Sequence, residues 1–176
     1  MRVAFVTPYL PWPADTGGKL RSYYLIKGLA QQFEVDLYTF RHGPEVDPGP
    51  LANLCREIVV TPLQLKPGAM RTVTSLTNPL PRSVRWFQTE ESLRAVRHAL
   101  TSPYDLYLCD EIVVAPYVWH LPGREETPRI INRQKIDYLH YAETARSRPA
   151  GVEKMLDWVE ARRLRTFEYA EMTKFD

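Results

Sequence analysis

The sequence predicts an α/β fold in which helices cover both faces of a doubly wound, Rossmann-like parallel sheet. Short apolar runs of the kind found in buried parallel strands alternate with helical patterns along the 176 residues. The first two strand patterns are separated by a single helical pattern, and a strand–helix–strand unit of this kind indicates a right-handed parallel crossover. The chain also contains 15 prolines, most of them between the apolar runs, which predicts long, shaped connecting loops.

The chain opens with a strand, a proline-rich loop and a helix. The apolar run Arg2–Thr7 predicts a buried strand, and Pro8 ends it because proline cannot continue a central strand. Gly17 and Gly18 then lie in a turn before a helix. The apolar face of that helix recurs at helical spacing and comprises Ser22, Leu25, Ile26, Leu29, Ala30 and Phe33. A helix that begins at two glycines can bring backbone N–H groups towards an anion, although the same pair also suits a plain turn.

Four more strands follow, each an apolar or alternating run bounded by polar or turn-forming residues. They are predicted at Glu34–Phe40, Glu57–Leu63, Tyr104–Cys109 and Arg129–Asn132. Polar residues follow the last two runs directly, so these residues are expected at the carboxyl edge of the sheet.

Helical patterns fill most of the intervals between strands. Leu51–Arg56 predicts a short helix, whereas residues 64–87 show no regular pattern. Thr89 suits the N-cap of a further helix, since glutamates occupy its first turn. The buried stripe of that helix is expected to be Leu93, Val96 and Leu100. Ile112–Leu121 predicts a mostly buried helix, and residues 152–172 predict a long charged one.

The charges of the last helix predict a solvated, ion-paired face. The residues expected on that face are Glu160, Arg162, Arg163, Arg165, Glu168 and Glu171.

Composition argues against several classes of function. A net charge of +2 is too small to indicate a nucleic-acid partner. Cys55 and Cys109 lie in apolar surroundings, which favours a reduced, cytoplasmic compartment. The histidines (His42, His98, His120 and His140) have no mutual ligand spacing, so neither a metal nor another cofactor is expected. No signal peptide, membrane-spanning run or G-x-G-x-x-G fingerprint is present in the sequence, and the last absence disfavours a dehydrogenase.

Three stretches carry a resemblance to a known family. Residues 6–22 read VTPYLPWPADTGGKLRS, residues 78–84 read NPLPRSV before an acidic helix start, and residues 130–137 read IINRQKID. Together they resemble the N-terminal domain of GT-B glycosyltransferases, specifically retaining family 4 and its bacterial members that build surface polysaccharides. The third stretch departs from the family, whose members often carry an aspartate, a histidine and then Asn-x-Glu there.

The resemblance implies an enzyme of two domains with its active site between them. Such an enzyme moves a sugar from a nucleotide-sugar donor to a saccharide or lipid-linked acceptor, without a metal, in the cytoplasm or at the inner membrane face. Residues 1–176 would be a single acceptor-side domain, and the donor domain would lie beyond Asp176. The domain alone is then not expected to transfer sugar. The alternative is a stand-alone Rossmann-like module that binds a sugar, lipid or nucleotide without catalysis.

The resemblance places donor binding at the glycine turn, where the backbone would pack against the diphosphate and sugar. A nearby cation could stabilise the departing pyrophosphate, and glycine allows the close approach. The expected donor-binding residues are Gly17, Gly18, Lys19 and Arg21.

The carboxyl ends of the fourth and fifth strands supply the remaining polar candidates, because open α/β sheets bind ligands there. Glu111 is the catalytic candidate and is expected to contact a sugar hydroxyl. The acceptor-side candidates are Asp110, Arg133, Lys135 and Asp137. Asp110 alternatively caps the next helix, and the other three could equally form a surface ion-pair cluster.

A basic, aromatic patch precedes the acidic helix and comprises Arg82, Arg85, Trp86 and Phe87. Exposed aromatics beside arginines suit an anionic membrane or a lipid-linked acceptor. The alternative is that these aromatic side chains fold back onto the core.

Overall fold

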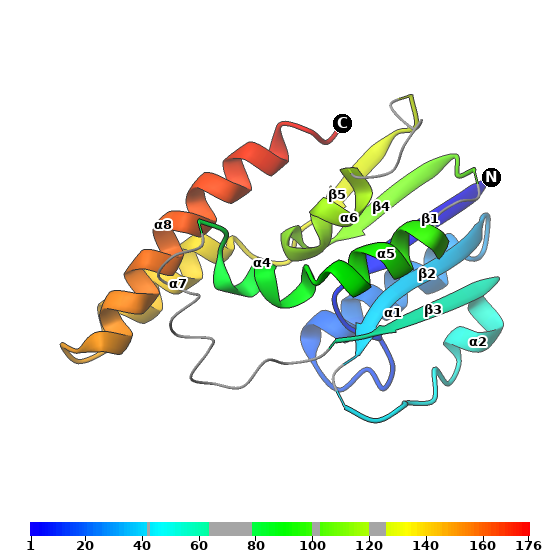
Figure 1. Cartoon of the computed structure of the whole chain (residues 1–176). Coiled ribbons are helices and arrows are strands. Elements are labelled where there is room, and N and C mark those ends of the chain that lie inside the picture. Colours follow the sequence, from blue (N-terminus) through cyan, green and yellow to red (C-terminus); the bar gives the residue numbers. More distant parts are fainter. Residues whose placement is uncertain (42, 64–78, 100–102, 120–125) are drawn as a thin grey trace.

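The computed structural model describes residues 1–41, 43–63, 79–99, 103–119 and 126–176 (Figure 1). Within these residues, strands form one all-parallel sheet with the order β3-β2-β1-β4-β5. The strands are β1 (Arg2–Thr7), β2 (Glu34–Arg41), β3 (Glu57–Pro62), β4 (Leu106–Asp110) and β5 (Arg129–Asn132). Because the strand order reverses between β1 and β4, the sheet is doubly wound, and the predicted α/β, Rossmann-like fold is confirmed.

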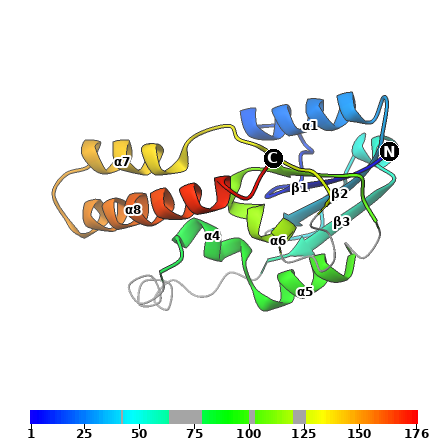
Figure 2. The same cartoon turned by 90° about the horizontal axis from the view of Figure 1, so that it is seen from above.

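Helices cover both faces of this sheet (Figures 1 and 2). They are α1 (Gly17–Leu29), α2 (Leu51–Leu54), α4 (Arg82–Phe87), α5 (Glu90–Ala99), α6 (Ala115–Trp119), α7 (Asp137–Ser147) and α8 (Val152–Met172). α1 lies on one face of the sheet, and α4, α5 and α6 lie on the other (Figure 2). α7 and α8 pack side by side beyond the carboxyl ends of the strands (Figures 1 and 2).

Most predicted elements agree with the structure to within one or two residues. β4 starts at Leu106 instead of Tyr104, because Tyr104 turns away to donate its hydroxyl to Asp36 of β2 at 2.9 Å. The buried face of α1 is confirmed, with Ser22 and Ile26 both buried.

The predicted helix 112–121 is divided in the structure. A 3-10 turn spans Ile112–Val114, and α6 follows it from Ala115 to Trp119, the last described residue before the gap at 120–125. In α5, Val96 is buried and Leu93 packs against the core, as predicted, whereas Leu100 lies outside the described residues.

Two helices, α4 and α7, are absent from the sequence prediction, and α8 explains both. The Glu160 carboxylate accepts backbone hydrogen bonds from Arg82 at 2.9 Å and Ser83 at 3.0 Å, at the start of α4. In the same way Glu168 accepts the N–H of Tyr138 at 3.0 Å, at the start of α7. Each helix start is therefore capped by a residue far away in the sequence, which local patterns cannot reveal.

The prediction of a solvated α8 face is wrong for its glutamates. Glu160, Glu168 and Glu171 are all buried, while Arg162 and Arg165 are exposed. The carboxylates can be buried because N–H groups and cations of the protein satisfy them.

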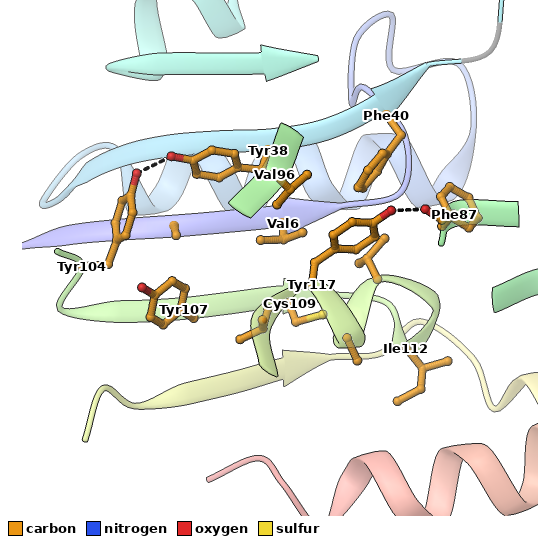
Figure 3. Close-up of a cluster of buried hydrophobic side chains, with 14 of the residues drawn as sticks. Val6, Tyr38, Phe40, Phe87, Val96, Tyr104, Tyr107, Cys109, Ile112 and Tyr117 are labelled. Atoms are coloured by element: carbon orange, nitrogen blue, oxygen red, sulfur yellow. Dashed lines mark hydrogen bonds between the residues drawn. The ribbon is translucent and has the colours of Figure 1, made fainter. Parts of the chain in front are cut away.

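Two hydrophobic cores pack against the two faces of the sheet. On the α1 face, Phe5, Leu37 and Val35 meet Ile26 of α1 and Leu51 of α2. The opposite core is rich in aromatic side chains (Figure 3). Its members Tyr38, Phe40, Phe87, Tyr104, Tyr107 and Tyr117 are shown there. Buried tyrosines need partners for their hydroxyls, and Tyr38 accordingly bonds to Tyr104, and Tyr117 to the Phe87 carbonyl.

The amino-terminal edge of the sheet is held by a buried ion-pair network centred on Asp36. Its carboxylate accepts hydrogen bonds from Arg2 at 2.9 Å, Arg56 at 2.8 Å and the Tyr104 hydroxyl at 2.9 Å. Burial alone would raise the pKa of Asp36, but these donors outweigh burial and lower it. The network joins β1, β2 and the approaches to β3 and β4.

Replacing Asp36 with Asn should lower the free energy of unfolding by about 3 kcal/mol, because it leaves two guanidinium groups without their buried anion. The matched control is Glu57→Gln, which removes an exposed carboxylate near the same Arg56 and should cost less than about 1 kcal/mol. Urea denaturation measures both. Equal losses would contradict the central role of Asp36.

The acid dependence follows from the lowered pKa of Asp36. Its contribution is present above the unfolded pKa of about 3.9 and disappears as the pH falls through the lower folded pKa. The difference between the natural chain and Asp36→Asn should therefore shrink in acid.

Candidate functional site

A pocket of about 490 Å³ opens at the carboxyl ends of β1 and β4, where the strand order reverses. Ligands of open α/β sheets bind at this kind of position. The walls come from the loop after β1, the start of α1, α4, the end of β4 and the segment from β5 into α7. The polar side chains that line the pocket include Lys19, Ser83, Glu111, Gln134, Lys135 and Asp137.

Asp110, the last residue of β4, ties together the elements around the pocket. It is fully buried, and its carboxylate accepts from Asn132 Nδ2 at 2.7 Å, Thr7 Oγ1 at 3.3 Å and the Ser22 hydroxyl. These donors come from β5, β1 and α1. Donors from the protein thus already use the acceptor positions of this carboxylate, so Asp110 holds the elements of the site in place. Asp110 does not cap the helical turn that follows it, the alternative considered from the sequence.

Glu111, the next residue, has a strained backbone. Its φ of 89° and ψ of 141° lie in a region that glycine tolerates, and it is the only non-glycine residue with positive φ in the described ranges. The backbone is held there by its own N–H, which donates to the Asn132 carbonyl at 2.9 Å, and by its carbonyl, which accepts from Val114. Such strain persists at functional sites, because the surrounding structure over-determines it.

The environment of Glu111 raises the pKa of its carboxyl group to about 7. Burial is the largest cause, and the neighbouring Asp137 and Asp110 carboxylates add to it. Lys135 and the Gln134 N–H act in the opposite direction. A carboxyl group with a pKa near neutral pH can both accept and donate a proton, so Glu111 stays the catalytic candidate.

The glycine pair begins α1 at the pocket, but its two members differ. A Cβ on Gly18 would lie 2.8 Å from the Gln134 side-chain oxygen, whereas a Cβ on Gly17 would meet nothing within 4 Å. Gly18 therefore lies in close contact with the end of the Gln134 side chain, which a Cβ there would displace; Gln134 Nε2 donates to the Gly18 carbonyl at 3.3 Å. Thr16 caps the helix by accepting from the Lys19 N–H at 3.4 Å.

The two basic donor-site candidates separate in the structure. Lys19 lines the pocket and pairs with Asp15 at 2.8 Å. Arg21 instead donates to Asn132 Oδ1 at 2.5 Å and to the Arg133 carbonyl at 3.2 Å. Its guanidinium therefore ties α1 to the end of β5, and the structure does not place it in the pocket.

The acceptor-side candidates also divide into two groups. Asp137 and Lys135 line the pocket and form an ion pair at 3.2 Å. Burial alone would lower the pKa of Lys135, but Asp137 and Glu111 together raise it. Arg133 does not reach the pocket, because its guanidinium pairs with the buried Glu168 of α8 at 2.7 Å.

One side of the pocket is aromatic. Tyr9, which follows β1, lies edge-on to Phe87 of α4 with ring centroids 5.7 Å apart. Trp86 also lines the pocket from α4, and Tyr141 and His140 line it from α7. A ligand here would meet polar groups and flat apolar rings together.

The predicted basic, aromatic patch does not form one surface. Phe87 is buried and Trp86 packs against the core, as the alternative reading proposed. Arg82 approaches Asp157 of α8 at 3.7 Å, and burial lowers the pKa of Arg85 against the opposing effect of Glu160. The arginines thus turn to the α8 carboxylates and the aromatics to the pocket, which corrects the expectation of an exposed patch.

Metal binding finds no support in the described residues. No group of three or more His, Cys, Asp or Glu side chains within them could hold a metal ion. His42 and His120 lie outside the described residues. Cys55 and Cys109 are buried free thiols, and burial raises the pKa of both.

Several residues of the pocket were missed or undervalued in the sequence. Tyr9 could have been noticed, since it follows a strand end by two positions. Ser83 could not, because α4 was not predicted and its start depends on Glu160. Gln134 comes from the segment between β5 and α7, where only the charged residues were singled out. Tyr141 and His140 were considered as aromatic contacts to a sugar, and they lie on α7, which was not predicted.

Comparison of the chain with protein-family models and with curated proteins finds no significant match. The chemistry of the pocket therefore carries the functional argument. That chemistry combines a titratable carboxyl group, a second carboxylate, a lysine, an amide and several aromatic rings around one cavity.

Gly17 and Gly18 provide a first test of the site. Gly17→Ala should raise the free energy of unfolding slightly, by up to about 1 kcal/mol, because alanine favours the helix and meets no obstacle. Gly18→Ala should be about 1 kcal/mol less stable than Gly17→Ala, since Gln134 must shift. Thermal or urea unfolding distinguishes them. Equal stabilities would show that the Gly18–Gln134 contact imposes no constraint.

Replacing Glu111 with Gly should increase the free energy of unfolding by about 1 kcal/mol, because glycine adopts the observed φ without strain. Glu111→Gln is the matched variant, since it removes the charge and keeps the strained backbone. If the glutamine variant is as stable as the glycine variant, the loss of stability at Glu111 comes from burial of its charge and not from the strained backbone.

Proposed function

We propose that this chain forms the acceptor-binding half of a retaining glycosyltransferase, which moves a sugar from a nucleotide-sugar donor to a saccharide or lipid-linked acceptor. The observation that carries the proposal is Glu111. Its strained backbone aims a carboxyl group of near-neutral pKa into the pocket at the reversal point of the sheet. Strain and a shifted pKa in one pocket residue are together typical of functional sites.

The pocket chemistry supports a sugar as the ligand. Carboxylates such as Glu111 and Asp137 accept hydrogen bonds from hydroxyls, and Gln134 and Ser83 can both donate and accept. The rings of Trp86 and Tyr9 offer apolar faces for the C–H surfaces of a sugar ring. A cavity that mixes apolar walls with a few polar groups is the usual form of a small-molecule site.

The start of α1 supports a place for the donor's diphosphate at the edge of the same pocket. The first N–H groups of a helix have no partner within it, and here Gly17 and Gly18 leave them accessible without side chains. Lys19 lies beside them in the pocket wall. In the proposal, these groups stabilise the charge that develops on the leaving pyrophosphate.

Glu111 then has a defined role in the proposed reaction. Its carboxylate accepts a hydrogen bond from a sugar hydroxyl and orients the ring, and Lys135 and Asp137 adjust its charge. No side chain is assigned as a covalent nucleophile. The nucleotide itself is held, in this proposal, by a second domain.

A binding module without catalysis is the second candidate, and one observation favours it. The pocket already combines polar groups such as Glu111 and Gln134 with the aromatic ring of Trp86, so a ligand could be held without a second domain. The two functions differ in what the chain binds alone. The acceptor half should bind simple sugars weakly and nucleotides little, whereas a nucleotide module should bind UDP or GDP tightly.

Calorimetric titration of the chain with monosaccharides and with UDP- and GDP-sugars tests the proposal. Sugar affinity should rise about tenfold from pH 6 to pH 8, because the pKa of Glu111 near 7 makes its ionised fraction grow through this range. Glu111→Gln should bind the sugar more weakly than the natural chain does at pH 8, and its affinity should not depend on pH in this range. The control is Glu90→Gln, an exposed carboxylate on α5 that should behave like the natural chain.

Two results would contradict the proposal. Tight binding of the nucleotide sugars by this chain alone would make it a nucleotide domain. Unchanged sugar affinity in Glu111→Gln would remove the residue on which the assignment depends.

A further inference from the structure

α8 carries an exposed stripe of aromatic, basic and methionine side chains, which we call the outer stripe. Its members follow one another at alternating steps of three and four residues, which places them on one side of a helix. They are Met155, Trp158, Arg162, Arg165, Tyr169 and Met172. All six are exposed, and Trp158 and Tyr169 expose 39% and 59% of their surface, unusually much for large aromatic residues.

Charge is segregated between the two sides of α8. Its inward acids, Asp157, Glu160, Glu168 and Glu171, are buried against the rest of the protein. In α7 and α8, both described in full, the exposed acids are Glu143 and Glu153, and Glu153 pairs with Arg148. The outer stripe therefore presents positive charge, although the helix as a whole is nearly balanced in sequence.

The aromatic residues of the stripe lie beside cations. The Arg165 guanidinium lies 5.8 Å from the Tyr169 ring centre, and Arg146 of α7 lies 5.9 Å from the Trp158 ring centre. Both distances fall within the range of cation–π contacts. An aromatic ring beside an arginine on an exposed helix suits the boundary between lipid headgroups and hydrocarbon.

We propose that the outer stripe docks this protein on an anionic lipid bilayer, with α8 lying in the plane of the surface. The arginines would contact lipid phosphates, while Trp158, Tyr169 and the methionines would enter the interface. α7 and α8 pack side by side at one end of the molecule (Figures 1 and 2). Docking lies on the surface, since no helix in the described residues could cross a membrane.

A second copy of the chain fits this stripe less well. Arg162 and Arg165 occupy its centre, so symmetric antiparallel pairing of two stripes would bring arginines against arginines. Like charges facing each other in this way oppose association. An anionic surface meets the same arginines with complementary charge.

Co-sedimentation of the full chain with vesicles tests the proposal. The chain should bind vesicles of phosphatidylcholine mixed with phosphatidylglycerol, and bind phosphatidylcholine alone weakly. Arg162→Glu with Arg165→Glu should lower the partition coefficient at least about tenfold, because basic residues near an anionic surface contribute strongly to binding. Trp158→Ala should also weaken it. The total emission of the four tryptophans in the natural chain should shift to the blue on binding, and Trp158→Ala should remove this shift.

Matched controls keep the test specific to the stripe. Lys27→Glu with Arg94→Glu changes the net charge equally at exposed sites on α1 and α5. Tyr24→Ala removes an exposed aromatic ring from α1. Both should bind vesicles like the natural chain. The test involves no sugar, so its outcome is independent of the proposed function.

Three outcomes would overturn lipid docking. The first is equal binding of the stripe and control variants, and the second is no preference for anionic vesicles. The third is a dimer in sedimentation equilibrium that Trp158→Ala dissociates, with no vesicle binding, which would assign the stripe to self-association.

Discussion

The rest of the site depends on the buried carboxylate of Asp110. A fully buried anion is stable only if donors surround it, and here the donors are Thr7, Ser22 and Asn132 from three different elements. The need to satisfy one carboxylate thus holds the end of β1, the second turn of α1 and the end of β5 around the same point. Glu111 follows directly, so its strained backbone adjoins this buried hydrogen-bond network.

α8 constrains the other side of the pocket through its own buried carboxylates. Glu160 holds the start of α4 and Glu168 holds the start of α7, and each of these helices contributes a wall. The helix that looks most ordinary in sequence, a mixture of arginines and glutamates, therefore determines the shape of the cavity. Its two sides differ in charge, because Asp157, Glu160, Glu168 and Glu171 are buried, whereas Arg162 and Arg165 are exposed.

These interactions explain how far the sequence could predict the molecule. Strands, α1 and α5 follow from local periodicity, and the rule that ligands bind at strand carboxyl ends located Gly18, Lys19, Glu111, Lys135 and Asp137 at one pocket. α4 and α7 were missed, because their caps come from residues distant in sequence. Arg21 and Arg133 do not line this pocket, since a long side chain can turn to a distant acceptor that no local pattern shows.

The two carboxylates of α8 also have a mechanical consequence. Glu160 and Glu168 are separated by roughly two helical turns, so α8 holds the starts of α4 and α7 at two separate points along its length. A displacement of α8 would therefore move the starts of α4 and α7 together. The aromatic wall of the pocket, from α4, and the wall that contains Asp137, from α7, would move with them. Two walls of the cavity are thus held by residues of α8 that do not line the cavity themselves.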